Sequence, residues 1–160
     1  MSEDTERQGR LERLRTSAQD WAPTDPQLEM GGMIEAAYLM AAADGDLSET
    51  EYDQLAATIE YISQSYLQAD QIQGTLEQLG ESLRIDGWEA RIAAIASSLP
   101  SPESRRNAYR LAAGVSFIDG LIQEEEERLF GLLAEAFGIA PEEATLILTE
   151  VRDEIFAPPT

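Results

Sequence analysis

The chain lacks cysteine, histidine and lysine, three of the residue types that most often carry enzyme chemistry. Without cysteine, disulfides, thiol nucleophiles and thiolate metal sites are excluded. Without histidine, the usual base near neutral pH and the commonest ligand of zinc, copper and nickel are missing. Because all 11 basic residues are arginine, Schiff-base chemistry and the P-loop lysine are excluded as well. Carboxylates, hydroxyls and guanidinium groups remain, a set that suits hard cations such as Ca²⁺, Mg²⁺ and Mn²⁺.

Long apolar segments are also missing, since no run approaches the roughly 20 residues that a membrane-spanning helix needs. We therefore do not expect the chain to span a membrane. Its first twenty residues alternate acids with arginines and lack the apolar stretch of a signal peptide, which indicates a cytoplasmic protein. The formal net charge of −20 would repel nucleic-acid phosphates and argues against a nucleic-acid partner. Adaptation of the surface for solubility explains the same charge without any ligand.

Strand signals are scarce, because valine occurs only at positions 115 and 151 and no segment alternates apolar with polar residues. Apolar residues instead recur at spacings of three and four, which predicts an all-α protein. The length of 160 residues fits one compact domain over 26–156, with an N-terminal extension over 1–25 and a tail over 157–160. We expect about seven helices, over 26–44, 48–66, 69–83, 87–99, 102–118, 123–137 and 141–155, and residues 5–20 are a candidate for one more.

Several helix starts carry recognisable caps. Asp25 and Ser101 each precede a proline that can occupy the first helical position. Asp86 is expected to cap the helix over 87–99. Ser48 and Glu51 match the S-x-x-E capping box, which predicts a helix start at this point.

The N-terminal segment carries a cluster of arginines. Four of them interleave with Glu6 and Glu12: Arg7, Arg10, Arg13 and Arg15. This pattern favours an exposed helix held by its own salt bridges. Docking of the helix on an acidic partner is the alternative.

Two parts of the chain resemble each other at an offset of 75 residues. This offset lays Asp44-Gly45 on Asp119-Gly120 and Glu51 on Glu126. Two related helical hairpins are therefore predicted, and each can bury one apolar face against the other.

The acidic stretch AAADGDLSETE at 41–51 is not an EF-hand. Counted from Asp44, the position that requires glycine is Glu49, and the position that requires a bidentate glutamate is Leu55. Two explanations remain: a turn between helices that needs no ligand, or a cation site formed by the acids. In the second copy Gln123 is a poorer cap than Ser48, so capping alone explains Glu126 less well.

A helix rich in small residues ends here in A-A-D-G, and an apolar residue and a glutamate lead into the next helix. With its second copy, this pattern over roughly residues 27–156 resembles the TerB family. The resemblance implies about seven helices with pseudo-twofold character, a link to tellurite resistance and bacterial stress response, and membrane-associated protein partners. It also implies divalent-cation binding by the acids that match by position, Asp44, Glu51, Asp119 and Glu126. The second copy departs from the pattern, because Phe117-Ile118 replaces small residues before its Asp-Gly step.

Three classes of function are open. The first is a non-enzymatic, cation-binding scaffold of the TerB type, which we favour. The second is a metal-free helical adaptor that uses an apolar groove or its N-terminal helix. The third is a carboxylate enzyme, which needs one acid with a raised pKa opposite an ionised one and is disfavoured without histidine, cysteine or lysine.

Overall fold

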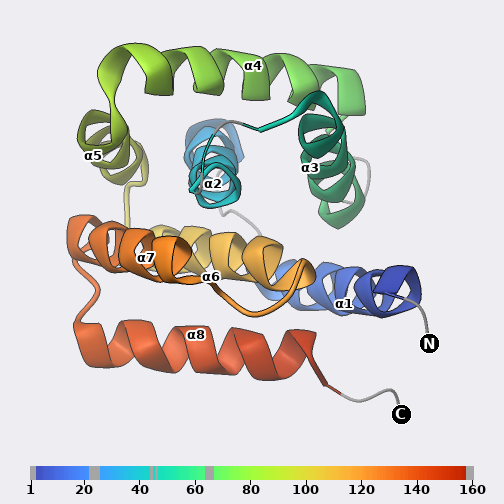
Figure 1. Ribbon diagram of the computed structural model, residues 1–160. Helices are drawn as coiled ribbons and strands as arrows, with labels where there is room; N and C mark the ends of the chain where they lie inside the picture. The colour runs from blue at the N-terminus through green and yellow to red at the C-terminus, as the bar shows by residue number, and fades with distance from the viewer. Residues whose placement is uncertain (1–2, 22–25, 44, 46, 64–66, 158–160) are drawn as a thin grey trace.

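The computed structural model describes residues 3–21, 26–43, 45, 47–63 and 67–157, and the regular structure in these segments is entirely helical (Figure 1). This finding confirms the all-α prediction. The seven expected helices correspond to α2–α8, and the N-terminal candidate corresponds to α1. The described elements are α1 (Glu3–Ala18), the 3₁₀ turn η1 (Gln19–Trp21), α2 (Pro26–Ala41), α3 (Glu49–Ile62), α4 (Ala69–Asp86), α5 (Trp88–Ser98), α6 (Pro102–Ile118), α7 (Glu124–Phe137) and α8 (Pro141–Ile155). No described helix is long and apolar enough to cross a membrane.

Helix starts follow the predicted caps at some positions and not at others. Pro102 lies in the first turn of α6, and the Oγ atom of Ser101 accepts a backbone N–H at 3.1 Å, as expected. The prediction that Asp86 caps α5 is wrong, because Asp86 ends α4 and Gly87 takes the cap position with a φ of +86°. Glycine adopts this conformation without the steric cost that a Cβ atom imposes. Asp25, the predicted cap of α2, lies outside the described residues.

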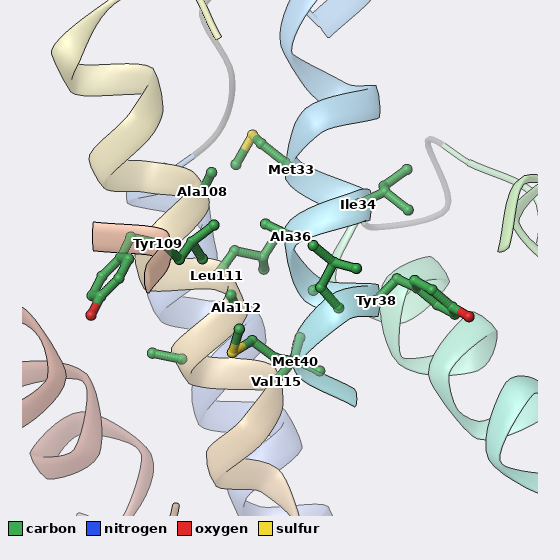
Figure 2. Packing of buried hydrophobic residues seen from close by; sticks show 14 of the residues in the cluster. Met33, Ile34, Ala36, Tyr38, Met40, Ala108, Tyr109, Leu111, Ala112 and Val115 are labelled. Carbon is green, nitrogen blue, oxygen red and sulfur yellow. The ribbon is translucent and has the colours of Figure 1, made fainter. Parts of the chain in front are cut away.

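Helices α2 and α6 form the centre of the core and make the most extensive contact of any described helix pair (Figure 2). Small side chains let the two backbones approach, and five alanines on these helices are fully buried: Ala36, Ala37, Ala108, Ala112 and Ala113. Larger buried side chains fill the space around them, including Met33, Met40, Leu111 and Val115. Since α2 and α6 are the first helices of the two repeats, the hairpins bury these helices against each other.

The remaining helices surround this central pair (Figure 1). On one side α3 packs against α4, and α5 contacts both α2 and α7. On the other side α7 and α8 pack on α6 and on each other. Each repeat therefore contributes one central helix and one outer helix joined by an Asp-Gly corner.

The glycines of the two Asp-Gly corners share their backbone geometry. Gly45 has a φ of +141° and Gly120 a φ of +132°. The N–H of Gly45 donates to the carbonyl of Ala42 at 3.1 Å, and the N–H of Gly120 donates to the carbonyl of Phe117 at 3.2 Å. These values favour glycine at both positions, which explains why the repeat retains it.

Helix α1 docks on the core through leucine side chains. It contacts α3, α6 and α8, and Leu14 is completely buried while Leu11 is 9% exposed. Leu14 lies so close to Gly114 of α6 that a Cβ atom on Gly114 would be 2.4 Å from Leu14 Cδ1. The close approach of the two helices therefore requires glycine at position 114.

The arginines of α1 bind the ends of other helices. Arg10 Nε donates to the carbonyl of Ile118 at the end of α6, and Arg13 Nε donates to that of Ile155 at the end of α8, both at 2.7 Å. A positive charge is favourable at these ends because the helix dipole places partial negative charge there. The interpretation of an exposed helix held by its own salt bridges is therefore wrong for these two arginines, since they join α1 to the core.

Candidate functional site

The first acidic corner is a capping box, as the sequence predicts. Ser48 N–H donates to Glu51 Oε1 at 2.9 Å, and Glu51 N–H donates to Ser48 Oγ at 3.2 Å. The hydrogen bond from the Ser48 backbone, followed by that from its hydroxyl, lowers the pKa of Glu51 below its ordinary value, because both stabilise the ionised form. Glu51 thus remains an exposed, charged carboxylate at the start of α3.

The second corner repeats this arrangement at Glu126. Its Oε1 atom accepts the backbone N–H of Gln123 at 3.0 Å, the counterpart of the bond between Ser48 and Glu51. The side-chain amide of Gln123 donates to the carbonyl of Leu121 at 3.1 Å. Glu126 therefore helps to start α7 although Gln123 is a poor cap, and a structural role explains this acid better than the sequence suggested.

Asp119 lies at the end of α6 and forms an ion pair with α1. Arg7 Nε is 2.9 Å from Asp119 Oδ1. The Asp119 side chain is 71% exposed, whereas that of Arg7 is only 29% exposed. This pair joins the N-terminal segment to the second Asp-Gly corner, a contact that the sequence pattern did not predict.

The two corners open onto one cleft of about 670 Å³. Three of the four predicted site residues line it, Glu51 from the first repeat and Asp119 and Glu126 from the second. Arg7 lines it as well, and its apolar wall is formed by Met40, Leu47, Leu55, Val115 and Ile118. The fourth predicted residue, Asp44, lies outside the described residues.

The carboxylates share this cleft without forming a preassembled metal centre. Within the described part of the chain, no three acidic side chains are grouped closely enough to hold an ion directly. One oxygen each of Glu51, Asp119 and Glu126 is engaged by a backbone N–H or by Arg7. Ser116 also lines the cleft, but its hydroxyl oxygen is buried and has no hydrogen-bond partner among the described residues. The cleft thus offers oxygen atoms on several sides, spread around a space that water can enter.

Comparison with known proteins identifies the family. The family described as "Tellurite resistance protein TerB" matches residues 32–148, a range that contains both Asp-Gly corners and excludes α1. Searches of curated proteins and of solved structures found no match. On the strength of the family match across both repeats, the chain belongs to the TerB family.

Proposed function

We propose that this chain is a non-enzymatic scaffold of tellurite resistance and stress response, which binds one hard divalent cation in the cleft between its Asp-Gly corners. The observation that carries this proposal is that Glu51, Asp119 and Glu126 line a single cleft although they come from different repeats. Cation binding there would link the two hairpins. It would also change the charge of the acidic surface that protein partners meet, including membrane-associated partners of the kind the family resemblance implies.

The residues present fit a hydrated ion better than a fully dehydrated one. Mg²⁺ usually keeps several waters and takes only one or two carboxylates directly, whereas Ca²⁺ takes six to eight oxygen ligands. A cleft lined by three separated carboxylates suits the first arrangement. Asp119 is the best direct ligand, because its side chain does not cap the start of a helix, whereas those of Glu51 and Glu126 do.

A carboxylate enzyme is less well supported. General acid catalysis needs a carboxyl group with a raised pKa, whereas the hydrogen bonds from Ser48 lower the pKa of Glu51. The sequence supplies no histidine, cysteine or lysine to serve instead. The proposal therefore assigns the cleft a binding role.

A metal-free adaptor is the second candidate, and one observation favours it. Glu51, Asp119 and Glu126 each already have a protein partner, so their positions are explained without a ligand. In this alternative the acidic corners serve only the turns and the docking of α1.

Calorimetric titration separates the two candidates. Mg²⁺, Ca²⁺ and Mn²⁺ are added as chloride salts at constant ionic strength to the wild type and to two variants, Asp119→Asn and Asp153→Asn. Asp153 is a matched control, because it is also an exposed acid that pairs with an arginine but lies in α8. We expect saturable binding of one ion per chain, weakened at least about tenfold by Asp119→Asn and unchanged by Asp153→Asn. Absence of saturable binding, or equal weakening by both variants, would support the adaptor.

A further inference from the structure

We propose that Arg7 is a built-in counter-ion of the acidic cleft, which competes with the divalent cation for Asp119, so that cation binding releases the first turns of α1. This inference rests on the proposed cation site and adds a regulatory role for a segment outside the matched family range of 32–148. It gives α1 the function of an intramolecular strap across the cleft.

Arg7 lies in the cleft and contacts Asp119. Its Nε atom contacts Asp119 Oδ1 at 2.9 Å, and its side chain lines the same cleft as Glu51 and Glu126. The guanidinium therefore supplies positive charge beside Asp119 in a cleft that three carboxylates line, which is the electrostatic task of a bound cation. A divalent ion that takes Asp119 as a direct ligand has to displace this contact.

The two halves of α1 are anchored to the core to different extents. Its second half is fixed by Leu14, which is completely buried against Gly114, and by the hydrogen bond from Arg13 to Ile155. None of the described side chains before Leu11 is buried. The first two turns can therefore detach from the cleft while the leucine anchor stays in place.

The contacts of Arg10 mark the end of the part of α1 that cation binding would release. Its Nε atom donates to the carbonyl of Ile118 at 2.7 Å, and its guanidinium lies 5.3 Å from the centre of the Phe156 ring. These contacts do not involve the carboxylates of the cleft, so a cation does not compete for them. Gly9 lies between Arg7 and Arg10 and lowers the helical stability of this segment, which favours local opening there.

The competition is reciprocal and moderate. An ion pair of which one partner is largely exposed contributes little to stability, so the cation can displace Arg7 readily. By linkage, the factor by which Arg7 lowers the affinity for the cation equals the factor by which the bound cation weakens the docking of Arg7. We expect removal of the Arg7 charge to tighten cation binding by about threefold to tenfold.

The test compares Arg7→Gln with Arg15→Gln in calorimetric titrations with MgCl₂, CaCl₂ and MnCl₂. Both variants remove one positive charge from α1, but Arg15 lies over the ring of Tyr61, 4.5 Å from its centre, and serves as the control for net charge. Arg7→Gln should bind the ion about threefold to tenfold more tightly than Arg15→Gln. Circular dichroism of each variant verifies that the helical content is unchanged.

Hydrogen exchange measured by mass spectrometry gives an independent readout on the wild type. Saturating cation should speed amide exchange over residues 4–10 and leave residues 11–18 protected. If the wild type binds the ion but the affinities of the two variants agree and exchange over 4–10 is unchanged, the strap is refuted while the proposed function stands. If neither the wild type nor Arg7→Gln binds any of the three ions, the proposed function and the strap both fail.

Discussion

Arg91 donates two hydrogen bonds to the carboxylate of Glu35, from Nε and from Nη2, each 2.7 Å long. The Glu35 side chain is only 7% exposed, so this pair joins α2 to α5 at a largely buried position. Arg91 also donates from Nη1 to Asp86 at 3.2 Å, which adds the end of α4 to the same network. A buried carboxylate needs such a partner, because desolvation of an unpaired charge is costly.

Arg91→Ala should therefore destabilise the protein by about 3–5 kcal/mol, since it leaves Glu35 buried without its cation. Arg84→Ala is the matched control, because Arg84 pairs with Glu81 on the exposed surface of α4 and its loss should change stability little. Urea unfolding followed by far-ultraviolet circular dichroism measures both. Equal losses of unfolding free energy in the two variants would contradict a larger contribution of the pair of Arg91 and Glu35 to stability.

Gly114→Ala should loosen α1 and destabilise the protein by about 1–3 kcal/mol, because the new Cβ atom would lie 2.4 Å from Leu14 Cδ1. Gly131→Ala is the control. Gly131 lies in the middle of α7, and a Cβ atom there would meet nothing within 4 Å. The substitution should stabilise by about 0.5–1 kcal/mol through helix propensity alone. Thermal unfolding of both variants tests the opposite signs. A destabilisation by Gly131→Ala equal to that by Gly114→Ala would argue against specific packing of α1 at Gly114.

Glu51 should make stability depend on pH in a defined direction. Its pKa is lower in the folded protein than the ordinary value of 4.5, mainly through the hydrogen bond from the Ser48 backbone. The stability it adds is therefore fully present above pH 4.5 and is lost as the pH falls through the folded pKa. The stability difference between wild type and Glu51→Gln should be largest near neutral pH and shrink on acidification below 4.5, measured by urea unfolding across this range.

The control for this measurement is Glu49→Gln, which removes a carboxylate from the same turn of α3. A pH dependence of Glu51→Gln identical to that of Glu49→Gln would contradict a specific role for the hydrogen bonds from Ser48.

Local features of the fold could be predicted from the sequence because they depend on neighbouring residues. The capping box of Ser48 and Glu51 was predicted and is present, as is the cap of α6 at Ser101. Asp86 was assigned wrongly as the cap of α5, because the sequence allows either Asp86 or Gly87 to stand at the boundary between α4 and α5. The positive φ of Gly87 places the cap at the glycine.

The docking of α1 could not be predicted in this way. Arg10 and Arg13 bind carbonyl groups 108 and 142 positions away, and helical periodicity contains no information about such partners. Two signals were present nonetheless. Gly114 inside a helix is costly unless a close contact requires it, and Glu35 stands alone within an apolar segment, which indicates a buried charge with a partner.

The candidate residues could be named from the sequence, but their common cleft could not. The repeat identified Glu51, Asp119 and Glu126 by position, but only the packing of α2 against α6 places the two corners on one cleft. The contact between Arg7 and Asp119 was not predicted, because charge patterning within the N-terminal segment favoured partners inside that segment.

The proposal of one cation cleft shared by both repeats is tested most directly by Mn²⁺ in nuclear magnetic resonance, because this paramagnetic ion broadens the signals of nearby nuclei. The backbone amides of Glu51 and Glu126 report on the two corners, and that of Glu150 in α8 serves as a reference. At substoichiometric Mn²⁺ both corner signals should broaden together at the same concentration, while the Glu150 signal stays sharp. Broadening at one corner alone, or at neither, would contradict a single site built from both repeats.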